Sequence, residues 1–220
     1  MKNPQRIDLS HTIEEGMITY KGLPAPIICD YLSREASKNM YGADTTFQIG
    51  KIEMVANTGT YIDAPFHRFE RGKDLAALAV ERLVHLEAVR IDAREFGQKG
   101  IQKKLFEGRD LKNKAVLIQT DWSQHWRTDQ YFENHPFLTA NAAHYLKEQG
   151  VTLVGIDSHN IDDVQDLKRP AHTILLGADI PIVEHMTNME AIQQDEFYFS
   201  AIPPKIRDFG TFPVRAVAYY

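Results

Sequence analysis

The sequence has 220 residues, of which 43% are hydrophobic and 25% charged, and its formal net charge at pH 7 is −5. This length fits one domain with one substantial core, so we expect a single domain over residues 1–220. The acidic balance, with no Lys/Arg run longer than two residues, argues against nucleic acid or an anionic membrane as the main partner and favours a small-molecule substrate.

Cysteine content and the first residues point to the cytoplasm. The one cysteine, Cys29, cannot form an intrachain disulfide. The residues after Met1 lack the apolar core of a signal peptide, and no segment approaches the about 18 to 20 apolar residues that span a bilayer. We therefore expect a soluble, cytoplasmic protein.

The first segment with a chemical signature is Asn57-Thr-Gly-Thr-Tyr-Ile-Asp-Ala-Pro-Phe-His67. A carboxylate at Asp63 and an imidazole at His67, with Gly59 and Pro65 restricting the backbone, can hold a metal ion or a proton-transfer pair. The alternative is that Asp63 and His67 are turn residues that bond to nearby backbone groups.

Apolar spacing beyond this segment predicts a mixed α/β fold. A helix is expected from Leu75 to Leu86, packed as a support beside the segment. Strands are expected over 115–119 and 151–156, separated by a helix that Thr139 begins and Gly150 ends. Chemistry is expected where such strands end, which places the loop that begins at Asp157 near the site. The predicted fold class is thus α/β, a mixed sheet with flanking helices.

The segment with Asp63 and His67 forms one half of a candidate site, and a second candidate half-site lies further along the chain. His172 precedes an apolar run, and Glu184 ends the segment 180–183, which is β-branched apart from Pro181 and predicts a short strand. A desolvated carboxylate at Glu184 requires a metal ion, an Arg or Lys partner, or a proton, and the residues alone leave these three open. The alternation over 214–219 predicts a half-buried strand, with Arg215 facing away from its neighbours.

Segments in order along the whole chain resemble the cyclase family, which includes bacterial kynurenine formamidases, isatin hydrolases and polyketide cyclase-like proteins. Besides the two half-sites, the resemblance rests on Ile7-Asp-Leu-Ser-His11, on residues 154–162 and on Phe212-Pro-Val-Arg-Ala-Val217. It implies the family's swivelling β/β/α architecture. It also implies a homo-oligomer, a dimer or tetramer, in which residues 20–41 lie across a partner subunit.

The family's central motif is His-x-Gly-Thr-His-x-Asp-x-Pro-x-His, and Asn57 and Tyr61 occupy its first two His positions in this chain. An amide is a weaker metal ligand than imidazole, and a phenol must lose a proton with a pKa of about 10, so hydrogen bonding is the favoured role for both. His159, in the polar loop after Asp157, can replace a missing ligand; the alternative is a solvated loop residue.

Four residues match the family's functional positions. The resemblance implies that Asp63, His172 and Glu184 bind one divalent ion, Zn²⁺ or Mn²⁺ by ligand type. His67 would carry protons, a role that imidazole side chains commonly serve. The implied activity is that of a metal-dependent, arylformamidase-like hydrolase of an amide, formamide or lactam. N-formylkynurenine, opened to kynurenine and formate in tryptophan catabolism, is the substrate to try first.

Two alternatives remain open. Metal-free cyclisation or dehydration, with His67, Asp63 and Glu184 as acid and base groups, would survive chelation. A non-catalytic small-molecule binder would keep the fold and the cleft without productive metal activation. Phe66 and Trp122 could line an aromatic substrate pocket, although packing explains them equally.

Overall fold

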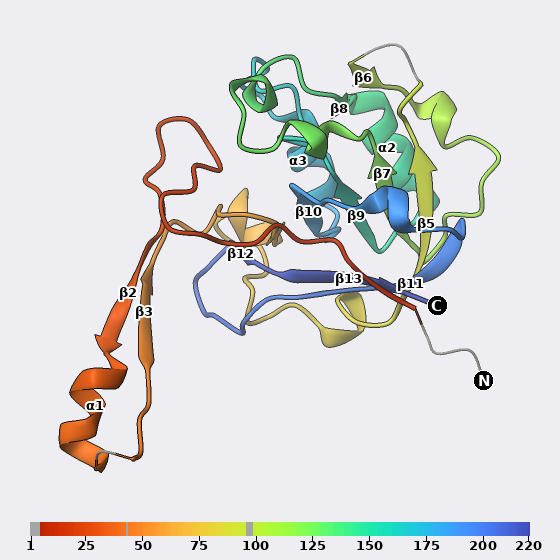
Figure 1. Ribbon diagram of the computed structural model, residues 1–220. Coiled ribbons are helices and arrows are strands. Elements are labelled where there is room, and N and C mark those ends of the chain that lie inside the picture. Colours follow the sequence, from red (N-terminus) through yellow and green to blue (C-terminus); the bar gives the residue numbers. More distant parts are fainter. Residues whose placement is uncertain (1–4, 43, 96–98) are drawn as a thin grey trace.

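The computed structural model describes residues 5–42, 44–95 and 99–220 (Figure 1). Its helices are α1 (Arg34–Tyr41), α2 (Ala140–Gln149) and α3 (Pro170–Leu176), with 3-10 helices at Pro65–His67, Val80–Arg82, Lys103–Leu105, Trp122–His125, Asp129–Phe132 and Met189–Ala191. Its strands are β1 (Arg6–Asp8), β2 (Ile27–Leu32), β3 (Ile49–Glu53), β4 (Tyr61–Asp63), β5 (Leu86–Asp92), β6 (Gly100–Ile101), β7 (Ala115–Gln119), β8 (Phe137–Leu138), β9 (Leu153–Ile156), β10 (Ile182–Glu184), β11 (Glu196–Ile202), β12 (Thr211–Pro213) and β13 (Arg215–Tyr219). Within the described ranges, no helix has the length and apolar character needed to cross a membrane.

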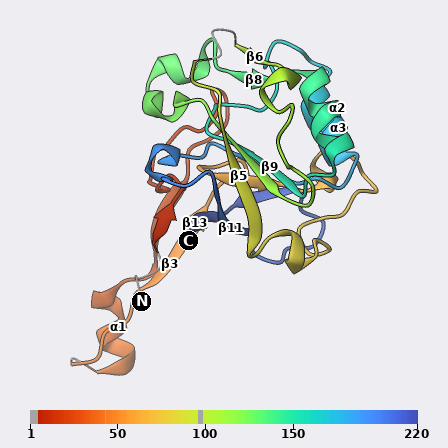
Figure 2. The same cartoon turned by 90° about the vertical axis from the view of Figure 1, so that its right-hand side faces the viewer.

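Over the described residues, the main sheet has nine strands in the order β1-β13-β11-β5-β7-β9-β10-β4-β12. The run from β5 through β7 and β9 to β10 is parallel, and the flanking pairs are antiparallel. β12 and β13 lie near opposite ends of this order, yet only Val214 separates them along the chain. The sheet therefore has to curl until its two ends approach each other, as Figure 1 and Figure 2 show. This curled, mixed sheet with helices beside it confirms the predicted α/β class.

Alternating side chains divide the core into two clusters on opposite faces of the sheet. In β7, Ala115 and Leu117 belong to the cluster inside the curl, which β4, β11 and β13 also enter. Val116 and Ile118 belong to the outer cluster, where α2 and α3 pack on the sheet. Because both faces are covered, the first four residues of β7 form an uninterrupted apolar run in the sequence.

The predicted order of strand, helix and strand between residues 115 and 156 is confirmed. α2 begins after Thr139, whose hydroxyl accepts a hydrogen bond from the Ala142 nitrogen at 3.3 Å, and it ends at Gly150, whose φ is +71°. β7 and β9 are the strands predicted on either side of it. β10 and β13 match the short and the alternating strands predicted later, and Arg215 is exposed while Ala216 is buried.

The helix predicted from Leu75 to Leu86 is wrong. This segment consists of turns and the 3-10 helix Val80–Arg82, and β5 already begins at Leu86. Asp74 closes a turn by accepting backbone hydrogen bonds, and His85 has a φ of +53°, which no α-helix accommodates. The leucines are nevertheless buried in the inner cluster, so their spacing reflects packing of an irregular segment.

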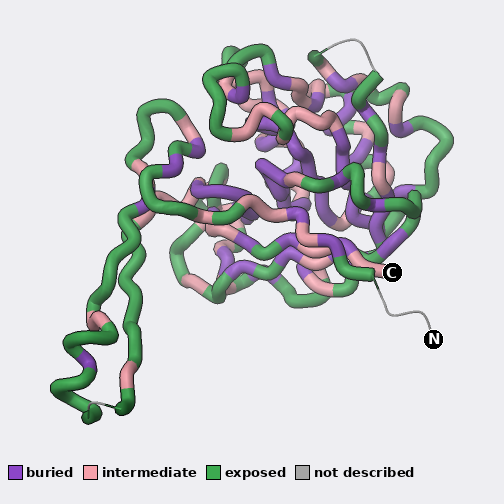
Figure 3. Tube along the Cα trace, in the orientation of Figure 1, coloured by how far each residue is buried: buried purple, intermediate pink, exposed green. Residues whose placement is uncertain are grey.

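A two-stranded arm projects from the body of the molecule. It contains β2, α1 and β3, and Figure 3 shows that it is almost wholly exposed. In the described part of the chain, β2 and β3 pair only with each other. Ile27, Ile28, Ile49 and Ile52 are between 40% and 53% exposed. An isolated pair of strands is marginally stable in water, so the arm presents apolar surface that its own chain leaves uncovered.

Candidate metal centre

The strand β4 carries the centre of the site and lies between β10 and β12. Tyr61 and Asp63 are two positions apart on this strand, so their side chains face the same side of the sheet. The register places Glu184 of β10 opposite Tyr61 and Thr211 of β12 opposite Asp63. Because directly paired residues share a face, four buried polar groups from three distant segments meet there.

His67 reaches the same place from the 3-10 helix that follows β4. Pro65 begins this helix, and the Ala64 nitrogen donates to the Gly210 carbonyl at 2.7 Å. A Cβ at Gly210 would lie 2.5 Å from the His67 backbone nitrogen, a separation that a side chain cannot adopt. Gly210 therefore allows the segment that leads into β12 to pack directly against His67.

His172 lies in the first turn of α3, where the Asp162 carboxylate holds both the helix end and the ring. Asp162 accepts hydrogen bonds from the backbone nitrogens of Ala171 and His172, and it lies 2.7 Å from His172 Nδ1. The Nδ1 proton is committed to Asp162, so Nε2 faces Asp63 Oδ2 at 3.6 Å and Glu184 Oε1 at 3.7 Å. Burial acts to lower the pKa of His172, but Glu184, Asp162 and Asp63 raise it to about 10. A metal ion at Nε2 would compete with that proton.

Thr211 fixes the orientation of His67. Its hydroxyl donates to Asp63 Oδ1 at 2.7 Å and lies 2.9 Å from His67 Nδ1. A hydroxyl has one proton, so Thr211 accepts from His67, and Nδ1 carries the ring proton. The other ring nitrogen, Nε2, lies 3.8 Å from Asp63 Oδ1. Both imidazoles therefore turn Nε2 toward Asp63.

Asp63, His67 and His172 form a cluster that fits one divalent ion, and one ligand atom from each lies within 4.8 Å of the others. In the part of the chain that the structure describes, Asp63 Oδ2 is buried without a hydrogen-bond partner, which is costly for a carboxylate oxygen. Burial acts to raise the pKa of Asp63, but His67, His172 and Thr211 hold it below its usual value. Ligands about 2.1 Å from a tetrahedral zinc ion lie roughly 3.4 Å apart. The 3.6 and 3.8 Å between the Asp63 oxygens and the two Nε2 atoms are close to that separation.

The family model described as "Putative cyclase" matches residues 7–163, which is most of this sequence. The chain belongs to the cyclase family. The kynurenine formamidase of Bacillus anthracis is 29% identical over 222 residues, covering 99% of this chain and 98% of that protein. The kynurenine formamidase of Bacillus mycoides is also 29% identical, with the same coverage. The predicted family resemblance is confirmed.

Solved structures share this cyclase fold. An isatin hydrolase bound to the product analogue thioisatinate gives a TM-score of 0.84 at 20% identity, over 99% of this chain and 92% of that one. A structure described as a potential metal-dependent hydrolase with cyclase activity gives a TM-score of 0.80 at 24% identity, over 98% of both chains. The cyclase-like architecture predicted from the sequence is therefore confirmed as a fold.

Tyr61 occupies a His position of the cyclase motif, and here it bonds to Glu184. Its hydroxyl donates to Glu184 Oε2 at 2.6 Å, and the Ile161 nitrogen donates to Oε1 at 2.6 Å. Burial raises the pKa of Tyr61 well above its usual value, so the phenol keeps its proton and acts as a donor, as the sequence predicts. Burial also raises the pKa of Glu184 to about 7, with His172 opposing the rise and Asp63 adding to it. Glu184 is thus a hydrogen-bonded neighbour of the Asp63/His67/His172 cluster.

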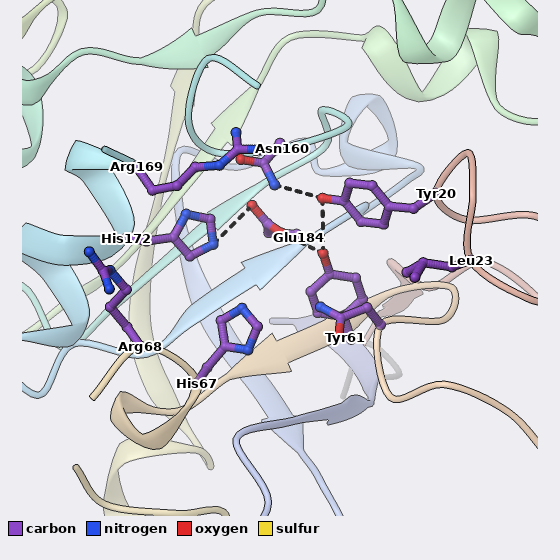
Figure 4. Close-up of a pocket in the computed structure, with 10 residues that line it drawn as sticks. Tyr20, Leu23, Tyr61, His67, Arg68, Asn160, Arg169, His172 and Glu184 are labelled. Carbon is purple, nitrogen blue, oxygen red and sulfur yellow. Dashed lines mark hydrogen bonds and ion pairs between the residues drawn. The ribbon is translucent and has the colours of Figure 1, made fainter. Parts of the chain in front are cut away.

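The cluster opens into a pocket of about 320 Å³, a volume that accommodates a small organic molecule (Figure 4). Five of the residues predicted for the site line it: Asn57, Tyr61, His67, His172 and Glu184. The structure thus brings the two half-sites together around one cavity.

Three other predicted residues lie elsewhere. Phe66 and Trp122 are outside the described lining of this pocket, and Trp122 Nε1 donates to the Tyr131 carbonyl at 3.0 Å. His159 is 4% exposed, so it is not a solvated loop residue, and its ring packs 4.6 Å from that of Tyr20. Burial lowers the pKa of His159 to about 3. Among the described residues, the cluster that fits an ion does not include it.

Sequence reasoning missed two residues that orient the site, Asp162 and Thr211. Asp162 ends the segment 154–162 that resembles the family, but no spacing rule pairs it with a ring ten residues later. Thr211 acts through its register with β4, which local sequence does not encode. The loop that begins at Asp157 does lie at the site, since Asn160 lines the pocket and the Ile161 nitrogen bonds to Glu184, while Asp157 itself accepts hydrogen bonds from the backbone that follows β7.

Proposed function

We propose that this chain is a metal-dependent hydrolase that opens an amide, formamide or lactam. The observation that carries the proposal is the buried Asp63 Oδ2, which has no hydrogen-bond partner in the described part of the chain and faces His172 Nε2 at 3.6 Å. Asp63 and His172 would hold one ion, with His67 or Glu184 as a third ligand. Oxygen and imidazole donors suit Zn²⁺ or Mn²⁺.

A bound ion in such a site supplies a water of lowered pKa and a polarised carbonyl oxygen. The protein's own contribution is orientation and proton transfer. Asp162 fixes the His172 ring, and Thr211 fixes the ring of His67. His67 Nε2 borders the pocket on a side chain that is 35% exposed, so it can accept a proton from the attacking water and deliver it to the leaving amine.

N-formylkynurenine is the substrate that we propose first. Relatives that match nearly the whole chain are kynurenine formamidases. The pocket volume of about 320 Å³ suits a ligand of this size. Tyr20 and Leu23 line the pocket and offer an aromatic and apolar surface for an arene.

Metal content and activity can be measured on the same preparation. Protein purified without chelator is expected to carry about one Zn²⁺ or Mn²⁺ per chain by elemental analysis and to release formate from N-formylkynurenine. Removing the ion with a chelator should abolish formate release, and adding the ion back should restore it.

Two results would redirect the proposal. Turnover that survives complete removal of the ion would favour metal-free acid–base chemistry by the same side chains. Binding of small aryl carbonyl compounds without any turnover, with or without the ion, would indicate a non-catalytic binder.

We also propose that the protein is a homo-oligomer, a dimer or tetramer, in which a second copy covers the arm. The support is the exposed apolar surface of Ile27, Ile28, Ile49 and Ile52 on strands that are marginally stable alone. Light scattering of the purified protein should give two or four times the chain mass of 25.1 kDa. A single-chain mass at micromolar concentration would contradict this.

A further inference from the structure

Two arginine side chains line the pocket beside the Asp63/His67/His172 cluster. Arg68 directly follows His67, and Arg169 directly precedes α3, so the elements that position the two imidazoles also position the two arginines. Within the described residues, neither guanidinium forms an ion pair with a carboxylate. The arginines that do form such pairs lie elsewhere, at Arg90, Arg94, Arg127 and Arg215.

Neutral hydrogen bonds hold both arginines and leave further donors for a ligand. Arg68 Nε donates to Thr173 Oγ1 at 3.2 Å, and Thr173 Oγ1 donates to the Arg169 carbonyl at 2.8 Å. Arg169 Nη1 donates to the Asp163 carbonyl at 3.0 Å. Among the described contacts, these leave both Nη atoms of Arg68, and Nε and Nη2 of Arg169, without a protein acceptor. Each guanidinium of these two lining residues therefore retains two donor nitrogens without a protein acceptor among the described contacts.

The backbone at Arg169 is held in an unusual conformation. Its φ is +49° and its ψ is +61°, in the left-handed region, and Pro170 follows it. This region is sterically unfavourable for a residue with a Cβ, and such residues persist where the surrounding structure fixes them. The Thr173 nitrogen and hydroxyl both donate to the Arg169 carbonyl and provide that fixation. The position of Arg169 is thus defined by the fold.

The rest of the pocket wall differs in character. Figure 4 shows Arg68 and Arg169 on the side that carries His172, with Tyr20 and Leu23 across from them. Glu184 supplies the one carboxylate among the described lining residues, and Tyr61 and the Ile161 nitrogen occupy its oxygens. The pocket thus has a cationic side, which includes His172 of the cluster, and an aromatic, apolar side.

We infer that Arg68 and Arg169 form a carboxylate-binding subsite, so that the substrate is an aryl carbonyl compound that also carries a carboxylate. This inference rests on the proposed function for the position of the reacting carbonyl. A guanidinium presents parallel donors that match a carboxylate, and such charge-assisted bonds are stronger than neutral ones. A neutral substrate would leave both guanidiniums facing the pocket without a counter-charge.

The test uses two substrates that differ by one group. N-formylkynurenine carries an amino-acid carboxylate, and N-formylkynuramine is the same molecule without it. The parent is expected to prefer the carboxylate-bearing substrate by ~10-fold or more in kcat/KM, mainly through KM, because one good charge-assisted contact has this effect. In Arg68→Gln, Arg169→Gln and the double variant, the ratio of the two kcat/KM values should fall toward one, because the loss falls on N-formylkynurenine, the substrate that carries the carboxylate. Arg109→Gln, at an exposed arginine away from the pocket, is the matched control.

Binding of the products provides a readout that does not require turnover. Calorimetry should show kynurenine binding more tightly than kynuramine to the parent and equally to the double variant. If neither substrate is hydrolysed but this binding difference is present and depends on both arginines, the proposed function fails and the subsite stands. A preference that persists in the double variant would mean that another group binds the carboxylate. That result, or an absence of preference in the parent, overturns the inference.

Discussion

Replacing Asp63 by Asn is expected to remove the bound metal ion and to lower kcat/KM by roughly 10³-fold, since an ion contributes several kcal/mol of charge stabilisation to such a reaction. Asp63 is fully buried and lies at van der Waals range from both Nε2 atoms, so among the described residues it is the one anionic group that both imidazoles share. An amide of the same shape carries no charge, and its NH₂ group would point at ring nitrogens that need an ion or a proton. Elemental analysis and formate release, measured on the same sample, test the two effects together.

Asp157→Asn is the matched control for this variant. Asp157 is also buried, at 1% exposed, but its oxygens accept hydrogen bonds from the Thr120 and Asp121 nitrogens away from the cluster. Its replacement should lower the melting temperature without removing the ion. If Asp63→Asn kept a full complement of metal and normal turnover, the cluster would have no role as a metal centre.

His67→Gln is expected to lower kcat by about 10² to 10⁴-fold, the usual contribution of a positioned general acid–base, while the protein retains its ion. The reason is the pair of bonds through Thr211, which directs the ring proton to Nδ1 and leaves Nε2 at the pocket. Stopped-assay kinetics, with metal content measured in parallel, give both quantities.

The metal content of this variant also decides between the two roles open to His67. Loss of the ion together with activity would make His67 a ligand, in place of a proton carrier. His144→Gln, at an exposed histidine of α2, is the control and should match the parent in both measurements. Unchanged kcat in His67→Gln with the ion retained would exclude both roles.

The elements of the fold that could be predicted from the sequence are those determined by neighbouring residues. The ends of α2 follow from Thr139 and Gly150, and β7 follows from an apolar run of strand length, so both were predicted with their bounds nearly correct. The helix over 75–86 failed because its leucines have helical spacing but are placed by the inner core, and the backbone between them turns instead. Periodicity reports which residues are buried more reliably than which conformation buries them.

The same distinction applies to the site: its residue types could be predicted, but the contacts between them could not. Asp63, His67, His172 and Glu184 could be singled out because their types and motif positions carry chemistry. That they meet at one pocket follows from β4 pairing with both β10 and β12, a long-range register that no local pattern contains. Asp162 and Thr211 escaped notice for this reason, since each acts only through a partner that folding brings to it.

The position of β4 also sets an order of events during biosynthesis. Tyr61–Asp63 leaves the ribosome early, but both strands that flank it, Ile182–Glu184 and Thr211–Pro213, come more than a hundred residues later. Until then β4 has two open edges and Asp63 lacks Thr211 and His172. Because domains on the ribosome fold only as their segments emerge, completion of this site has to follow synthesis of Thr211. A nascent chain stalled before that residue would hold its motif exposed and depend on other factors to keep the unpaired strand from aggregating.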